Sequence, residues 1–308
     1  MDMESKVFKK SRLWAVGLLF IITGCTTKFL YSNLDWLLVE YIDDYVTLND
    51  GQEDILSERI LVLGQWHKEN ELPQYVKQLD AISNKDPRQV DSDFVLAQMD
   101  EVKAHTKRLV EQITPDLYAL TQQMSDEQVK ELVENFEEKN RDFVKKYEGM
   151  NDDEVREIYQ ERIEENFERW FGSVNDTQKL LAKEWASSMK VTVFDWQEHR
   201  KQMNYYMRQL LNRRADLAYY QPEFQRFLND SESYYTPELA AKIAHNRALA
   251  AKYIALAVNS INPKQQSHLA SEIDEWKTIA EDLMTSMSLD HSPREFLVFK
   301  SYTEQVLI

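Results

Sequence analysis

Apolar residues recur every three or four positions over most of the chain, which is the period of an α-helix with one buried face. Leu34, Leu38 and Ile42 show this spacing near the start, and the stretch 175–219 keeps it for longest. There the periodic positions are Leu181, Trp185, Met189, Thr192, Trp196, His199, Met203, Met207 and Leu210. We therefore predict a long central helix over 175–219, in which the β-branched run 191–194 is the place for a kink or break.

Helix-start signals lie between these apolar stretches. A capping side chain followed three residues later by Gln or Glu forms a capping box, in which each side chain accepts the backbone N–H of the other residue. Boxes of this kind occur at Asn49/Gln52, Ser125/Gln128, Asn151/Glu154, Asn175/Gln178 and Asn262/Gln265. A cap followed by proline is a second start signal. It occurs at Thr114-Pro115, Thr236-Pro237, Asn262-Pro263 and Ser292-Pro293.

These signals, with Gly149 and Gly172 as expected helix ends, divide the chain into successive helices. The predicted segments are 29–46, 50–68, one from 73, then 92–113, 115–124, 125–148, 151–171 and 175–219, and four starting near 222, 237, 263 and 293. The chain has only 6 glycines in 308 residues, too few for the turns of an all-β fold. We predict an all-α fold, a multi-helix bundle of about ten to twelve helices with a long central helix.

The polar stretch 83–92 is the best candidate for a domain boundary. It would separate an N-terminal helical hairpin region, 25–82, from a main helical domain, 92–308. One continuous domain over 25–308 is the alternative. The glutamines of the four Gln-containing boxes, at 52, 128, 178 and 265, follow no fixed period, so the spacing does not indicate a solenoid repeat.

The first 25 residues have the parts of a secretory signal. Lys6, Lys9, Lys10 and Arg12 precede an apolar run from 13 to 22, and small residues lead to Cys25. The run is shorter than the roughly 20 residues that a transmembrane helix needs. The stretch resembles a bacterial lipobox, which implies that 1–24 is a removed signal peptide and that Cys25 carries the lipid. Thr26 rather than Asp follows, so the resemblance implies the periplasmic face of the outer membrane of a Gram-negative bacterium.

The balance of charges restricts the partners. The chain has 53 acidic and 37 basic residues and a net charge of −16. Such acidity argues against nucleic-acid binding, because neutralising phosphates requires Lys and Arg. The stretch 126–169 is strongly acidic and 200–226 is basic. We expect the acidic helices to face the basic segment within the fold; a polarised surface for a charged client is the alternative.

The chain carries none of the common catalytic motifs. It lacks a glycine-rich phosphate loop, a Gly-x-Ser-x-Gly elbow, a His-Glu-x-x-His pair and the Glu-x-x-His copies of di-iron helices. Carboxylates lie four residues from histidine in His67/Glu71, Glu101/His105, Asp195/His199 and His268/Glu272. A surface ion pair explains each of these, and no set of three metal ligands can be named. We therefore predict no metal and no cofactor, and we expect His199 to be a hydrogen-bonded core residue.

The densest cluster of unusual residues lies in the N-terminal hairpin. The two stretches are YSNLDWLLVEYIDDYVTLNDGQ, residues 31–52, and WHKENELPQY, residues 66–75. They resemble the signature of an uncharacterised family of Gram-negative lipoproteins. That resemblance implies a helical fold and an envelope location but no mechanism. The candidate binding residues here are Asp43, Asp44, Trp66, His67, Glu71 and Tyr75.

A second resemblance concerns the boxes that contain glutamine. The stretch MSDEQVKEL, residues 124–132, is similar to the Leu-Thr-x-x-Gln motif of small periplasmic helical chaperones. We expect a protein that contacts the membrane through lipidated Cys25 and serves as a non-catalytic interaction or scaffold protein, chaperone-like in holding an envelope client. The alternative is an envelope hydrolase or metal-dependent enzyme that uses His67, Glu71, Asp43 and Asp44. Because a helix rises about 1.5 Å per residue, the two aspartates should lie several turns from His67.

Overall fold

The computed structural model describes residues 33–285, and all regular structure in this range is helical. The predicted all-α class is confirmed. The elements are α3 (Leu34–Asp43), α4 (Asp50–Asn70), α5 (Leu72–Ser83), η2 (Pro87–Gln89), α6 (Ser92–Gln122), α7 (Asp126–Lys146), α8 (Asp152–Phe171), α9 (Asp176–Ser188), α10 (Val193–Asn212), α11 (Leu217–Asn229), η3 (Ser231–Tyr234), α12 (Pro237–Asn259) and α13 (Pro263–Thr285). Cys25, the signal segment and Ser292-Pro293 lie outside the described residues.

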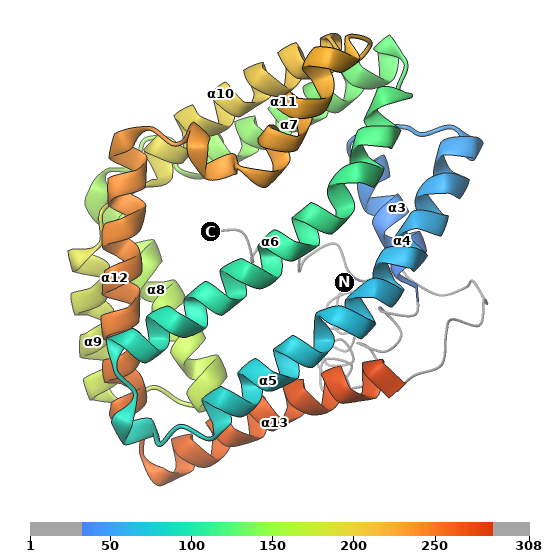
Figure 1. The fold of residues 1–308 in the computed structure, drawn as a ribbon. Helices are drawn as coiled ribbons and strands as arrows, with labels where there is room; N and C mark the ends of the chain where they lie inside the picture. Colours follow the sequence, from blue (N-terminus) through green and yellow to red (C-terminus); the bar gives the residue numbers. More distant parts are fainter. Residues whose placement is uncertain (1–32, 286–308) are drawn as a thin grey trace, which may run out of the picture.

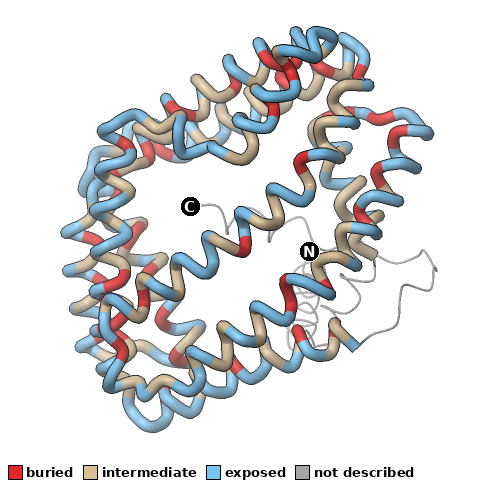
Figure 2. Tube along the Cα trace, in the orientation of Figure 1, coloured by how far each residue is buried: buried red, intermediate tan, exposed pale blue. Residues whose placement is uncertain are grey.

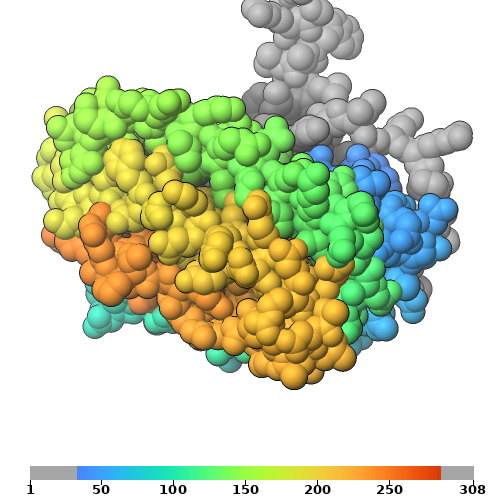
Figure 3. All heavy atoms as spheres, turned by 90° about the horizontal axis from the view of Figure 1, so that it is seen from above, coloured from blue at the N-terminus to red at the C-terminus, as the bar shows by residue number. Residues whose placement is uncertain are grey.

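The helices form a four-sided frame that α6 crosses (Figure 1). In that view α8, α9 and α12 make one side, α7, α10 and α11 the next, and α3 and α4 the third. The fourth side is α5 packed along α13. Helix α6, with 31 residues, packs against α12 near its start and against α11 near its end. Seen from above, the molecule is an elongated body rather than a sphere (Figure 3).

The hydrophobic core is divided between the sides of the frame. One cluster joins α3, α4, α7, α10 and α11 and includes Val129, Tyr220 and Phe224. A second joins α8, α9 and α12 and includes Val155 and Phe167. Figure 2 shows buried positions gathered along these sides, while α6 carries few of them. Each fully buried large apolar side chain contributes about 1.5–3 kcal/mol, so the first cluster holds two neighbouring sides together and the second holds the side made by α8, α9 and α12.

All five capping boxes form as predicted. In each box the cap side chain accepts the N–H of the third helical residue, whose side chain accepts the N–H of the cap. Gly149 and Gly172 have φ values of 77° and 72°, and Gly172 ends α8 as expected. These turns need glycine because a side chain is strained in the left-handed region.

The predicted helix start at Thr114-Pro115 is wrong. Helix α6 continues through Pro115 to Gln122. Thr114 is 3% exposed, and its hydroxyl donates to the carbonyl of Val110, 2.6 Å away, and lies 3.2 Å from Asn229 Oδ1. The residues beyond Pro115 pack into the core cluster that α11 also joins, and this packing outweighs the local preference of proline for a helix start.

The predicted single helix over 175–219 is also wrong, and α6 is the longest described helix instead. The chain breaks between Ser188 and Val193, beside the β-branched run named as the place for a break. Asn246 holds the break, because its side chain accepts from the N–H of Lys190 and donates to the carbonyl of Lys190, both at 2.8 Å. Helix α11 starts at Leu217 rather than near Pro222.

Only the first half of the acidic stretch, α7, faces the basic segment as expected, because α8 packs against α9 and α13. Helix α7 packs along α10. Arg208 forms an ion pair with Glu137, and Arg214 forms one with Asp126 at 2.5 Å. Exposed pairs of this kind contribute about 0–1 kcal/mol each, so they set the orientation of the two helices more than their stability. None of the helices within 33–285 is both long enough and apolar enough to cross a membrane.

The glutamines of four capping boxes meet in two pairs. Gln52 and Gln128 exchange hydrogen bonds through their side-chain amides, at 3.2 and 2.6 Å. Gln178 and Gln265 do the same, at 3.3 and 2.8 Å. Gln178 is 0% and Gln265 is 1% exposed. Each pair therefore ties together the turns of two helical hairpins, α3–α4 to α6–α7 and α8–α9 to α12–α13.

The two pairs have the same geometry in finer detail. The amide N–H of Gln128 also donates to the carbonyl of Thr47, and that of Gln265 donates to the carbonyl of Ser173, both at 2.9 Å. Both carbonyls lie five positions before the first glutamine of their pair, in Thr47/Gln52 and Ser173/Gln178. The described chain thus contains the same two-hairpin junction twice. Sequence spacing does not reveal it, because the distances between paired glutamines differ.

We predict that Gln178→Leu lowers the free energy of unfolding by about 1–3 kcal/mol, because it breaks the buried amide pair with Gln265 and removes the acceptor of the Asn175 N–H. The double variant Gln178→Leu with Gln265→Leu should lose less than the sum of the single variants, since each single variant already breaks the same two hydrogen bonds between the amides. Urea unfolding followed by circular dichroism measures both. Gln209→Leu, at an exposed position of α10, is the matched control. If the loss of unfolding free energy in the double variant equalled the sum of the two single losses, the pairing of Gln178 with Gln265 would be contradicted.

Candidate functional site

Three of the six candidate residues of the hairpin come together where α4 meets α5. Glu71 is the single residue between Asn70, which ends α4, and Leu72, which starts α5. Pro73 near the start of α5 suits this restart, because its missing N–H costs nothing in the first turn. Glu71 is therefore held at a helix junction, with His67 one turn before it and Tyr75 one turn after it.

Glu71 is 1% exposed and is bound by two side chains from α6. Arg108 Nε donates to Oε1 at 2.6 Å, and Arg108 Nη2 donates to Oε2 at 2.9 Å. His105 Nδ1 lies 2.9 Å from Oε2. His105 and Arg108 are three residues apart, which places both on one face of α6. The Arg–carboxylate pair is bidentate, the strongest geometry for such an ion pair.

The tautomer of His105 follows from its neighbours. Gln78 Nε2 donates to the carbonyl of Gln98 at 2.9 Å, which orients the Gln78 amide with Oε1 toward His105. Because Oε1 can only accept, His105 Nε2, 3.1 Å away, carries the proton. In the neutral ring, Nδ1 then accepts from Arg108 Nη2 at 2.6 Å. A second proton on Nδ1 would be donated to Glu71.

His67 and Tyr75 complete this group of side chains, which we call the Glu71 cluster: His67, Glu71, Tyr75, Gln78, His105 and Arg108. The Tyr75 hydroxyl lies 3.2 Å from His67 Nε2, and the Tyr75 ring packs edge-on against His105 with ring centres 4.5 Å apart. The cluster joins α4 and α5 to the middle of α6. The hydrogen bonds of the cluster therefore hold the middle of α6, the longest described helix, against the α4–α5 junction.

The pKa values in the cluster follow from these contacts. Hydrogen bonds from Arg108 hold the pKa of Glu71 below its usual range, so the carboxylate stays ionised. Burial lowers the pKa of His67 and raises the pKa of Tyr75, so both stay neutral near pH 7. An ionised carboxylate whose two oxygens are bound by protein groups is poorly suited to general acid or base catalysis, since a substrate has no free oxygen to contact.

The other candidate residues lie apart from the cluster. Asp43 ends α3 and Asp44 follows it, at the opposite end of α4 from His67. Helix α4 has 21 residues, which makes it about 30 Å long. Trp66 is half-buried one residue before His67. The structure thus brings together His67, Glu71 and Tyr75 but not the two aspartates, and the separation expected from the sequence is confirmed.

The explanation of His67/Glu71 as a surface ion pair is wrong, because Glu71 is buried and Arg108 is its partner. The same explanation fails for Glu101/His105, since His105 is 6% exposed and contacts Glu71. Sequence reasoning missed Arg108 and Gln78 altogether. A carboxylate on one helix and a His-x-x-Arg face on another can be recognised only when the two helices are known to cross.

His199 is a buried, hydrogen-bonded histidine, as expected. It is 8% exposed and lies between the rings of Trp196 and Tyr235, with ring centres 5.4 and 5.2 Å away. Burial lowers the pKa of His199, while a hydrogen bond with the backbone of Tyr234 opposes that effect. Across 33–285, no group of three His, Cys, Asp or Glu side chains is placed to hold a metal ion.

The fold and the cluster define a class: an all-helical protein whose buried polar groups tie helices together. Residues 44–240 match the model of a family of unknown function, DUF6279, so the chain belongs to that family. The match covers α4 through α11 and includes the whole Glu71 cluster. The expectation of an uncharacterised family is confirmed, and the match, which begins at residue 44, does not test the lipobox-like stretch. Neither a curated protein nor a solved structure matches the chain.

We predict that Glu71→Ala lowers the free energy of unfolding by about 2–4 kcal/mol, because it leaves Arg108 and His105 without their buried partner. Urea unfolding followed by tryptophan fluorescence measures the change. Glu69→Ala, at an exposed position two residues away, is the control and should change stability by less than about 0.5 kcal/mol. If both variants lowered the free energy of unfolding by a similar amount, the prediction that Glu71 holds α6 through Arg108 and His105 would be contradicted.

We also predict that the protein loses stability as the pH falls below the ordinary His67 pKa of 6.5, because the folded state disfavours protonated His67 and the unfolded chain accepts the proton. The Glu71 contribution is present above its ordinary pKa of 4.5 and is lost at still lower pH. Unfolding free energies at about pH 7.5 and 5.5 measure the first effect. His67→Gln should reduce the drop in unfolding free energy between the two pH values. His245→Gln, at an exposed position, should leave that drop unchanged. An unchanged fall in His67→Gln would contradict the assignment.

Proposed function

We propose that this chain is a lipoprotein, anchored through Cys25 to the periplasmic face of the outer membrane, whose helical body is a non-catalytic scaffold for a protein partner. The proposal combines the lipobox-like stretch that ends at Cys25 with the exposed helix that crosses the frame. The partner would be an unfolded or assembling envelope protein, held in a chaperone-like manner close to the membrane.

The observation that carries the scaffold role is the exposure of α6. This helix has 31 residues, of which only Val95, His105 and Thr114 are buried. Helix α8, with 20 residues, buries five. Helix α6 also exposes Val102, which is 56% accessible. A long helix that is fixed at intervals and exposed between them offers a continuous surface to another chain, because its backbone is already ordered before binding.

The Glu71 cluster supports a scaffold over a hydrolase or metal-dependent enzyme. Both oxygens of Glu71 are bonded to Arg108, and the carboxylate is closed to solvent. Asp43 and Asp44, which the enzymatic alternative would use with His67, lie at the other end of α4. The enzymatic alternative needs a carboxylate and a histidine that converge on a cavity, and none of the cluster residues lines the cavity between α5, α6, α12 and α13.

The Gln-containing boxes support the chaperone-like proposal only in that they start helices, as the resembling motif does in small periplasmic chaperones. Their resemblance to the motif of small periplasmic chaperones concerns helix starts, and here the glutamines join the turns of hairpins. Arg208 of α10 and Arg214, just after α10, are paired with acidic residues of α7. A client is therefore expected to contact apolar and aromatic positions of exposed helices rather than a basic groove.

We predict that a photo-crosslinking residue at Val102 captures the partner in outer-membrane preparations, because this position is the exposed apolar site of α6. The same residue at Leu180 of α9, also 56% exposed, is the matched control and should capture much less. Gel shifts and mass spectrometry measure the products. The partner so identified should co-purify less with Val102→Glu than with the wild type, if that variant melts like the wild type. Equal capture at both positions would contradict the role of α6.

For the anchor, we predict that Cys25→Ser removes the protein from the outer-membrane fraction and blocks cleavage after residue 24, because both steps need the thiol. Membrane fractionation and the mass of the product measure this. Thr26→Ser, a change next to the cysteine, should leave fractionation unchanged. A Cys25→Ser product of mature size that still fractionates with the outer membrane would show that the anchor is elsewhere.

A further inference from the structure

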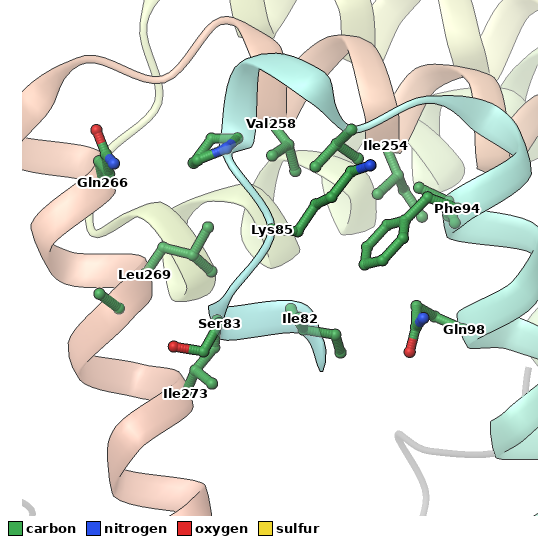
Figure 4. A pocket seen from close by; sticks show the side chains of 14 residues that line it. Ile82, Ser83, Lys85, Phe94, Gln98, Ile254, Val258, Gln266, Leu269 and Ile273 are labelled. Carbon is green, nitrogen blue, oxygen red and sulfur yellow. The ribbon is translucent and has the colours of Figure 1, made fainter. Parts of the chain in front are cut away.

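A cavity of about 230 Å³ lies where the end of α5, the 84–91 connection, α6, α12 and α13 meet (Figure 4). Most of its wall is aliphatic and includes Ile82, Ile254, Leu269 and Ile273, with Phe94 as the single aromatic ring. The polar stretch that the sequence marks as a candidate domain boundary forms part of this wall. The cavity shares no lining residue with the Glu71 cluster.

The size of the cavity limits its occupant. A cavity of about 150 Å³ lined by Leu, Ile and Phe takes up one benzene molecule. By that scale a volume of about 230 Å³ accepts roughly nine or ten heavy atoms, such as a medium-length alkyl chain. The aliphatic walls favour a flexible chain over a flat ring system, because Ile, Leu and Val side chains leave an irregular space.

Hydrogen-bond donors stand around this apolar space. They are the Lys85 ammonium, the Ser83 hydroxyl and the side-chain amides of Gln98 and Gln266. The Lys85 side chain extends across the cavity in Figure 4, and its Nζ lies 5.2 Å from the centre of the Phe94 ring. Within 33–285, no carboxylate lies within 4.0 Å of Lys85. The chain has a net charge of −16, yet the Lys85 ammonium beside this apolar cavity has no ion-pair partner among the described residues.

Gln98 adds a second polar side chain to the wall of the cavity. Its Oε1 is buried and has no hydrogen-bond partner within the described chain. An unpaired buried amide costs about 1–3 kcal/mol, so such groups usually have a role. The backbone carbonyl of Gln98 accepts from Gln78, which fixes this turn of α6 against α5. Because Oε1 can only accept, it cannot bond a carboxylate in this orientation. The terminal torsion of glutamine is broad, so the amide can turn over and place Nε2 at that position, where it donates to an anionic group.

We propose that this cavity binds an aliphatic carboxylic acid of about eight to ten carbons. The alkyl chain lies among Ile82, Ile254 and Leu269, and the carboxylate accepts hydrogen bonds from Lys85 and the Gln98 amide. The anionic end of such a ligand would pair with Lys85, which has no ion-pair partner among the described residues, and the aliphatic tail would contact the aliphatic side chains of the wall. The site is independent of the scaffold role, since it involves neither Val102 nor the Glu71 cluster.

The test uses the full lipidated protein in phospholipid nanodiscs with decanoate labelled with ¹³C at its carboxyl carbon, and empty nanodiscs as the blank. We expect saturable binding, seen as a shifted carboxyl resonance, and at least tenfold weaker binding in Lys85→Gln. Binding of 1-decanol should change less than twofold in Lys85→Gln, because the alcohol lacks the charge. Lys107→Gln, at an exposed position of α6, is the matched control and should bind decanoate like the wild type.

A second variant tests the cavity itself. Ala270→Phe places a ring at the exposed edge of the lining and should abolish binding of decanoate and 1-decanol, while its melting temperature stays near that of the wild type. The proposal is overturned if decanoate gives no saturable signal above empty nanodiscs, or if Ala270→Phe binds it unchanged. It is also overturned if Lys85→Gln binds decanoate as well as the wild type, or if a lysophospholipid with a ten-carbon chain displaces decanoate more strongly than unlabelled decanoate does.

Discussion

The structure depends on reciprocal hydrogen bonds between glutamines that also cap helices. Each of the four glutamines accepts the N–H of its own cap through the amide oxygen and donates to its partner through the amide nitrogen. One side chain therefore satisfies a helix end and a contact between hairpins at the same time. Without that second contact, two hairpin turns would bury polar groups against each other, which costs more than leaving them in water.

The Glu71 cluster solves a related problem in the middle of the frame. Helix α6 is too long and too exposed to be held by apolar burial along its whole length, since it buries only three residues. The bidentate contact between Glu71 and Arg108, with His105 beside it, fixes its central turns to α4 and α5. The exposed stretches of α6 between these fixed points are the surface on which the proposed partner would bind.

Part of the candidate site could be inferred from the sequence. His67, Glu71 and Tyr75 lie within one short stretch, so helical geometry alone brings them near one another. Their partners could not be inferred, because His105 and Arg108 reach Glu71 only through the crossing of α6 over the α4–α5 junction. The sequence also suggested surface ion pairs for these histidines, since spacing along one helix carries no information about a second helix that covers it.

What the sequence by itself determined is the local structure: the helical class and all five capping boxes. Each of these depends on residues within one turn of each other, so the signal is complete in a short window. Only the tertiary structure decided that helix α6 continues through Pro115 and that the glutamines form two equivalent pairs. It also decided that the stretch 83–92 lines a cavity. These outcomes depend on packing between residues far apart in the chain, where burial of apolar and amide groups outweighs local preference.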